Sequence, residues 1–157
     1  MCDSNYHTPT DFRDMITAKN INNDENLTII SINIANIMTK LDHFKIFIKD
    51  LNTKRNKIDI IALTETHLTE TKINTYTKGE LENLLEGYVF ICKGRKSKNG
   101  GGVGVFISED IEDEVVGQDD EIFVEEVFES IVLKIKHKID NHTTKDITLI
   151  YLLLSMN

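Results

Sequence analysis

Two apolar segments that each end in a polar residue constrain the fold of this chain more than any other feature. The first runs from Leu27 to Asn33 and the second from Ile58 to Glu65. Between them, apolar residues recur at spacings of four and three, which places one apolar stripe along a helix. The segment therefore predicts a strand at 27–34, a helix at about 38–53 and a strand at 58–64. The stripe consists of Ile37, Leu41, Phe44, Ile48 and Leu51.

Asn33 and Glu65 occupy equivalent places at the ends of the two predicted strands. Parallel strands joined by a helical crossover have their carboxyl ends at the same edge of the sheet, where open α/β sheets gather ligands. A carboxylate after an apolar run is costly to bury alone, so Glu65 requires solvent, a cation or several hydrogen-bond donors. A Mg²⁺ ion meets this requirement, because magnesium commonly uses one or two carboxylates with water and phosphate. A strand-end glutamate in solvent is the alternative interpretation.

The rest of the chain predicts strands and one short helix. Asn99 and Gly100 favour the positive backbone angles of a tight turn, so the strands on either side are expected to form a hairpin. The glycines at 100–102 precede a strand and lack the lysine and hydroxyl residue of a P-loop, so they do not predict a nucleotide site. The helix is expected at 80–85, and the strands at 88–93, 103–108, 130–136 and 147–153.

Charge is distributed unevenly along the chain. The formal net charge is −8, and eleven acidic but no basic residues lie between Glu109 and Glu129. Removing those eleven from the 26 acidic residues leaves 15 against 18 basic ones, a net charge of +3. The acidic segment predicts an exposed, self-repelling loop remote from nucleic acid. The basic cluster of Arg95, Lys96 and Lys98 predicts either phosphate contacts or an ordinary exposed hairpin.

Length and composition are typical of a single domain. The chain has 157 residues, of which 40% are hydrophobic, enough for one core. The polar segment 1–26 predicts a flexible leader before a domain at 27–157; it lacks the apolar core of a signal peptide, and no apolar run is long enough for a membrane span. We therefore expect an intracellular protein, nuclear or cytoplasmic and not secreted, without membrane contact. Cys2 and Cys92 predict reduced thiols. The sequence leaves the oligomeric state open.

Five short motifs occur in a characteristic order: Ile29–Asn36, Asp59–Leu68, Gly87–Val89, Gly100–Ile107 and Ile147–Tyr151. This series resembles the N-terminal part of the endonuclease/exonuclease/phosphatase superfamily, most closely the apurinic/apyrimidinic-type endonuclease domain of non-long-terminal-repeat retrotransposons. The resemblance covers about residues 27 to 151, the front half or so of such a domain. It implies an α/β fold, a partial four-layer α/β/β/α sandwich of the DNase I-like type, with the C-terminal half missing.

The resemblance also implies roles for three residues. The glutamate of the matching motif is the family's metal ligand, which assigns that role to Glu65. The matching asparagine supports the metal and phosphate site, which assigns Asn33, and the matching tyrosine binds phosphate, which assigns Tyr151. Asn36 stands where the family commonly has glycine, and asparagine tolerates left-handed backbone better than most residues. The implied cofactor is Mg²⁺, with Mn²⁺ as a substitute, and the implied reaction is hydrolysis of DNA phosphodiester bonds.

The sequence departs from the family after Tyr151. The expected Arg-Pro-Pro-like turn is replaced by Leu152 to Asn157, and the later motifs that supply Asp, Asn and His do not occur. We therefore expect a truncated endonuclease that is inactive alone and exposes unpaired strand edges. Two alternatives stay open. One is a non-catalytic remnant or interaction module of a decayed element, and the other is a phosphatase of the same superfamily.

Overall fold

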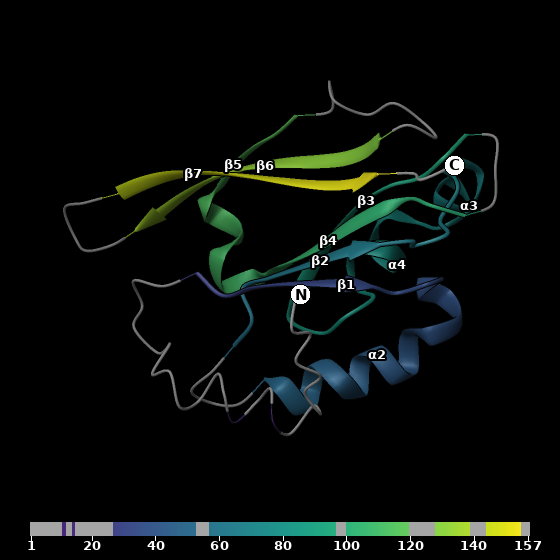
Figure 1. Ribbon diagram of the computed structural model, residues 1–157, viewed down its shortest axis with the longest axis horizontal. Helices are drawn as coiled ribbons and strands as arrows, with labels where there is room; N and C mark the ends of the chain where they lie inside the picture. The colour runs from purple at the N-terminus through teal and green to yellow at the C-terminus, as the bar shows by residue number, and fades with distance from the viewer. Residues whose placement is uncertain are drawn as a thin grey trace, which may run out of the picture.

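The structure is a computed structural model that describes residues 11, 14, 27–52, 57–96, 100–119, 128–138 and 144–154. The predicted leader at 1–26 lies outside the described residues apart from Asp11 and Asp14. The described strands form two stacked sheets, with helices on the outer side of the first sheet (Figure 1). In spatial order the first sheet contains β1 (Ile29–Asn33), β2 (Ile60–Thr64), β4 (Val103–Ser108) and β3 (Tyr88–Lys93), and the second contains β5 (Val115–Asp119), β6 (Phe128–Lys138) and β7 (Thr144–Leu154).

A strand-helix-strand unit opens the first sheet, as the apolar spacing predicts. β1 and β2 pair in parallel, and α2 (Ile37–Leu51) connects them. The Asn36 side chain caps this helix by accepting a hydrogen bond from the Thr39 backbone N–H, at 3.3 Å. Burial of one helical stripe against the sheet stabilises the unit, because each buried large apolar side chain contributes about 1.5–3 kcal/mol. The buried residues of the helix are Ile37, Phe44, Ile48 and Leu51.

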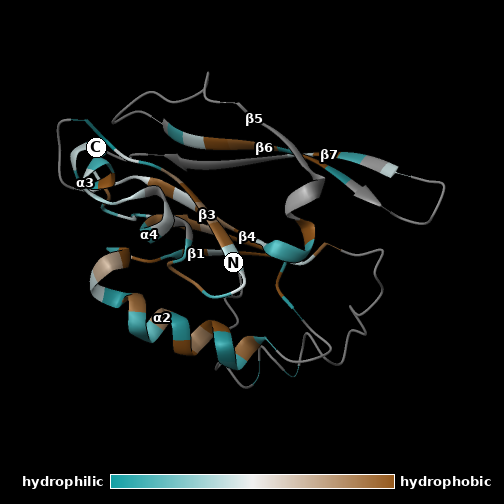
Figure 2. Cartoon of the chain, turned by 180° about the vertical axis from the view of Figure 1, so that it is seen from behind, coloured by the Kyte–Doolittle hydropathy of each residue, from teal (hydrophilic) through white to brown (hydrophobic). Residues whose placement is uncertain are grey.

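Two apolar cores lie on the two faces of the first sheet. In the core beneath α2, Phe106 of β4 stacks on Phe44 and Phe90, with ring centroids 5.6 and 4.3 Å apart. The other core lies between the sheets, where side chains of β4 meet those of β6; it includes Val103, Val105, Ile107, Ile131, Leu133 and Ile135. The brown, apolar strands accordingly occupy the middle of the molecule in Figure 2. The described residues thus form a helical layer and two sheet layers.

In the first sheet β4 pairs antiparallel with both β2 and β3, and the β3–β4 hairpin predicted around Asn99 and Gly100 is confirmed by pairing between Lys93 and Val103. None of the helices formed by described residues has the length and apolar character that a bilayer crossing requires. Cys92 is a free thiol on β3, and burial raises its pKa to about 12.

Four elements differ from the sequence expectation. The helix α3 (Glu70–Thr75) was not expected because none of its residues is buried, so it has no apolar stripe. The helix predicted at 80–85 is α4 (Lys78–Glu82), which begins earlier because Thr77 and Glu80 form a capping box. The acidic segment is not one loop: it contains the 3₁₀ helix η1 (Glu109–Glu114) and the edge strand β5.

Candidate functional site

The ends of β1 and β2 bring Asn33 and Glu65 to one edge of the first sheet, as predicted. Asn33 lies opposite Thr64 in the parallel register. The loops that follow run side by side, because the Asn36 N–H donates to the Glu65 carbonyl at 2.8 Å and the Ile37 N–H donates to the Thr66 carbonyl at 3.1 Å. The exposed Asn33 side chain accepts a hydrogen bond from the Ala35 N–H at 3.1 Å. Backbone hydrogen bonds therefore determine how the ends of β1 and β2 and the loops after them are arranged.

The Glu65 carboxylate is held through one of its two oxygens. Its Oε2 accepts a hydrogen bond from the Gly101 N–H at 2.9 Å and lies 3.1 Å from Nε2 of His67. No described residue donates a hydrogen bond to the other oxygen, Oε1. The side chain is 32% exposed. Glu65 is therefore a fixed carboxylate, and one of its oxygens has no hydrogen-bond partner among the described residues.

The backbone around this carboxylate is strained. Among the described residues, four that are not glycine have positive φ: Ala35 at 45°, Asn36 at 82°, Glu65 at 55° and His67 at 54°. All four lie in the two loops after β1 and β2. The left-handed conformation costs L-residues roughly 1–2 kcal/mol each and persists only where neighbouring contacts impose it, most often at functional sites. Asn36 has a positive φ, as expected at a position where the family commonly has glycine.

A second carboxylate reaches the same glycine loop, residues 100–102. Glu129, at the start of β6, is completely buried and accepts a hydrogen bond from the Gly102 N–H at 2.5 Å. Its other oxygen accepts a hydrogen bond from Nε of Arg95. The loop is also paired with the segment after β2, because the His67 N–H donates to the Gly101 carbonyl at 2.8 Å. Consecutive glycine N–H groups thus bind two carboxylates from different sheets.

These contacts correct two predictions from charge. Arg95 is not an exposed DNA contact, because only 9% of it is accessible and its guanidinium pairs with Glu129. Glu129 is not part of an exposed acidic loop remote from the site, because it is buried beside the glycine loop. At the other end of the acidic segment, Glu109 and Asp110 are exposed as predicted. One signal in the sequence could have found Glu129: it directly precedes the apolar segment predicted as a strand at 130–136, and β6 in fact begins at Phe128.

Lys72 and Lys96 are exposed cations in the described segments that follow β2 and β3. Lys72 of α3 is exposed, and its Nζ donates a hydrogen bond to the His67 carbonyl at 3.2 Å. Lys72 was not predicted as a site residue, because the sequence of α3 has no recognisable apolar pattern. Lys96 is exposed and lies three residues after Lys93, the last residue of β3. Lys98 lies outside the described residues.

Tyr151 is placed only through its backbone. It pairs with Ile131 in the β6–β7 register, two positions from the pair formed by Glu129 and Leu153. Glu129 contacts the glycine loop, so this part of β7 belongs to the same end of the second sheet. The Tyr151 side chain lies outside the described part of the structure. Its convergence with Asn33 and Glu65 stays a prediction.

The donor set fits magnesium better than a metal that needs a complete protein cage. Within the described residues, no group of three or more His, Cys, Asp or Glu side chains could enclose an ion. Magnesium tolerates this arrangement, because it retains several waters and commonly uses one or two carboxylates. Glu65 offers a carboxylate oxygen that no described residue contacts by a hydrogen bond, and the Asn33 Oδ1 has a second lone pair beyond the one used by Ala35. Both are oxygen ligands of the kind magnesium prefers.

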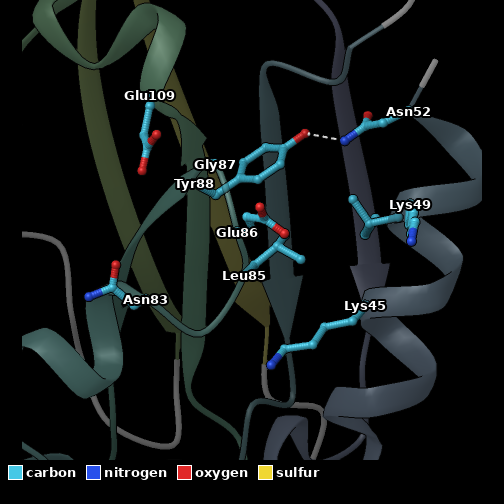
Figure 3. Close-up of a pocket in the computed structure, with 10 residues that line it drawn as sticks. Lys45, Lys49, Asn52, Asn83, Leu85, Glu86, Gly87, Tyr88 and Glu109 are labelled. Carbon is cyan, nitrogen blue, oxygen red and sulfur yellow. Dashed lines mark hydrogen bonds between the residues drawn. The ribbon is translucent and has the colours of Figure 1, made fainter. Parts of the chain in front are cut away.

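A hollow of about 710 Å³ lies at the opposite end of the first sheet (Figure 3). It is bordered by the second half of α2 and the segment leading into β3. The Tyr88 hydroxyl donates a hydrogen bond to the Ile58 carbonyl at 2.7 Å and accepts one from the Asn52 amide at 2.9 Å. Burial raises the pKa of Tyr88 to about 12. These contacts fasten the end of α2 to the sheet and are distant from the Glu65 edge.

Comparison with known proteins defines the fold. No family model and no curated protein sequence matches the chain. The solved AP endonuclease LMAP from Leishmania major is similar over 79% of this chain and 39% of that chain, with a TM-score of 0.55 and 16% identity. The 3′ phosphatase NExo from Neisseria, solved with a product DNA hairpin, matches over 69% of this chain and 37% of that chain, with a TM-score of 0.45 and 18% identity.

The likeness to LMAP confirms the predicted fold class. The helical layer and two sheets form part of a DNase I-like α/β/β/α architecture. The chain spans less than half the length of the solved proteins that it resembles.

Proposed function

We propose that this chain supplies the metal-binding edge of a Mg²⁺-dependent phosphodiesterase that acts on DNA, of the type found in the endonuclease domains of non-long-terminal-repeat retrotransposons. The observation that carries the proposal is the Glu65 carboxylate, which is held through one oxygen and has no partner for the other within the described part of the chain. It occupies the edge of a sheet in a DNase I-like fold. The motifs that include Asn33 and Tyr151 support the same assignment.

Glu65 and Asn33 are the residues proposed to hold the ion. A bound Mg²⁺ would act as a Lewis acid toward a phosphate oxygen and would stabilise developing negative charge. Glu65 contributes charge and a fixed direction, because the Gly101 N–H and His67 restrict its carboxylate. Mn²⁺ is proposed as a substitute. Tyr151 is proposed to contact phosphate through its hydroxyl.

DNA is proposed to approach the edge that Lys72 and Lys96 flank. Both side chains are exposed, and Lys72 is attached to the His67 carbonyl beside the carboxylate. Lysine contacts to phosphate give affinity that depends on salt and little on sequence. Lys98 keeps its predicted role as a phosphate contact. Arg95 does not, because its charge is already paired with Glu129.

The isolated 157-residue chain is proposed to bind metal and DNA without efficient cleavage. Hydrolysis requires a positioned base and a group that stabilises the transition state, and groups of these kinds contribute on the order of 10²-fold or more each. His67 is placed against Glu65. The described residues offer no cluster of His, Cys, Asp or Glu that would complete the site.

Fluorescence anisotropy with a short labelled DNA duplex tests the binding proposal. We expect Mg²⁺ to strengthen DNA binding by the wild-type chain relative to EDTA, and Glu65→Gln to abolish this increment. Asp42→Asn is the matched control, because Asp42 is an exposed carboxylate on α2. Binding that is the same in Mg²⁺ and EDTA would refute the proposed metal-assisted contact.

Relaxation of supercoiled plasmid tests the proposed lack of cleavage. We expect no Mg²⁺-dependent nicking by the isolated chain. Robust nicking that disappears in Glu65→Ala would keep the endonuclease assignment and refute the proposed inactivity. Glu65-dependent hydrolysis of a phosphomonoester without nicking would instead favour the phosphatase alternative.

A further inference from the structure

A buried ion pair outside the metal-ligand set connects the second sheet to the glycine loop. Glu129 has no exposed surface, and Arg95 retains only 9%. Both carboxylate oxygens are satisfied, one by Arg95 and the other by the Gly102 N–H. Replacing a buried ion pair by apolar residues of similar volume is often neutral or stabilising. Stability alone therefore gives little reason for two buried charges at this position.

The contacts lead from Glu129 to Glu65 through the two successive peptide units that flank the Gly101 Cα atom. Glu129 binds the N–H of Gly102, and Glu65 binds the N–H of the preceding residue, Gly101. Both glycines have positive φ, at 63° for Gly101 and 81° for Gly102. The position of one N–H group therefore restricts the direction of the other.

Arg95 also contacts the loop directly. A Cβ atom on Gly101 would lie only 2.3 Å from Cζ of the Arg95 guanidinium, so the loop and the guanidinium are in close contact. The Arg95 backbone is itself anchored, because its carbonyl accepts a hydrogen bond from the Glu70 N–H at 3.0 Å. Arg95 thus both pairs with Glu129 and limits movement of Gly101.

We infer that Glu129, oriented by Arg95, is a positioning residue for the Glu65 metal site and acts through the Gly102 and Gly101 N–H groups. The inference rests on the proposed function, in which Glu65 binds a divalent ion. Glu129 does not contact the ion. It holds the glycine loop where the Gly101 N–H fixes one oxygen of Glu65 and leaves the other free. The second sheet thereby sets the metal affinity of the first.

Two double variants separate positioning from stability. Arg95→Met with Glu129→Met removes both charges and the acceptor for the Gly102 N–H. Arg95→Met with Glu129→Gln also removes both charges, but the glutamine carbonyl can still accept that hydrogen bond. Methionine and glutamine are similar in length, so the pair differs mainly in this one contact. Thermal unfolding monitors the fold, and isothermal titration with Mn²⁺ measures affinity.

We expect the glutamine variant to bind Mn²⁺ more tightly than the methionine variant but less tightly than the wild type, because both double variants lack the orienting contact of Arg95. The methionine variant should bind about 10- to 100-fold more weakly than the wild type, the range typical for loss of a group that orients a metal ligand. Equal Mn²⁺ affinity in two folded double variants would overturn the inference. If the methionine variant does not fold, Glu129→Asp replaces it: shortening the side chain should weaken Mn²⁺ binding, and unchanged affinity would overturn the inference.

Wild-type and Glu65→Gln chains are titrated in parallel. Mn²⁺ binding that is absent from the wild type, or that persists fully in Glu65→Gln, would refute the proposed function. Mn²⁺ binding that depends on Glu65 but is unchanged by substitutions at position 129 would refute only the positioning role. The two failures are therefore distinguishable.

Discussion

The two ends of the first sheet handle their polar groups in opposite ways. At the Tyr88 end, the hydroxyl, the Asn52 amide and the Ile58 carbonyl satisfy one another. At the Glu65 end, the carboxylate uses one oxygen for the Gly101 N–H and His67, and the other receives no hydrogen bond from a described residue. The first end completes its contacts internally, whereas the second retains a polar atom for something outside the chain.

Backbone conformation follows the same division. The four described non-glycine residues with positive φ belong to the loops at the Glu65 end. At the Tyr88 end the positive φ falls on Gly87, where it costs little. Strain tolerated at one end only is typical of a binding site built on a rigid scaffold. The comparison therefore separates residues that maintain the fold from residues that serve the site.

The largest expected effect is the loss of stability when a glycine at each end of the sheet is replaced by alanine. Gly102→Ala should destabilise the chain by about 2–5 kcal/mol, because the residue has positive φ and a Cβ atom would lie 2.6 Å from Oγ1 of Thr66. Gly87→Ala should cost only about 1–2 kcal/mol, because it has positive φ but its nearest neighbour would be 3.9 Å away. Urea unfolding measures both. Equal losses would remove the distinction between a crowded loop and an open turn.

The next prediction compares one variant at each end of the sheet by its stability and by its Mn²⁺ affinity. Tyr88→Phe should lower the free energy of unfolding by about 1–3 kcal/mol, because the buried partners of the hydroxyl lose a hydrogen bond. Its Mn²⁺ affinity should stay unchanged. Glu65→Gln should do the reverse and remove Mn²⁺ binding with little loss of stability. Urea unfolding and Mn²⁺ titration of both variants check this, and a Glu65→Gln chain as unstable as Tyr88→Phe would contradict the division.

Alkaline pH should weaken the Tyr88 end selectively. Burial raises the pKa of Tyr88 from 10.0 to about 12, so the unfolded chain loses this proton first. The contribution of protonated Tyr88 to the free energy of unfolding is fully present below pH 10. It decreases by about 1–2 kcal/mol as the pH rises towards 12. Urea unfolding at pH 9 and pH 11 measures the loss. Tyr88→Phe should lose less stability over this range than the wild type, and parallel losses would show that Tyr88 is not responsible.

The smallest expected effect relieves strain at the Glu65 end. Ala35→Gly should raise the free energy of unfolding by about 0.5–1 kcal/mol, because glycine adopts the φ of 45° without the penalty that alanine carries, less its greater loss of chain entropy. Ala62→Gly, within the buried strand β2, is the control and should destabilise. Destabilisation by Ala35→Gly in thermal unfolding would mean that the loop is not strained there.

Local periodicity predicted the first sheet well but not the contacts between sheets. The spacing in α2 and the apolar runs of β1 and β2 depend on neighbouring residues, so the sequence was sufficient to place Asn33 and Glu65 at one edge. The pair Arg95 and Glu129 is separated by 34 positions, and its partners are chosen by sheet stacking rather than by any local pattern. Glu129 was also hidden in an acidic run whose average charge indicated exposure.

Paramagnetic broadening by Mn²⁺ in an amide NMR spectrum tests the central claim most directly. The account predicts that low Mn²⁺ concentrations broaden the backbone signals of Asn36, Glu65 and Gly101, that Glu65→Gln abolishes this broadening, and that Asp42→Asn leaves it intact. Broadening centred on the acidic helix η1 (Glu109–Glu114), or broadening near β2 that survives in Glu65→Gln, would contradict a metal site at Glu65.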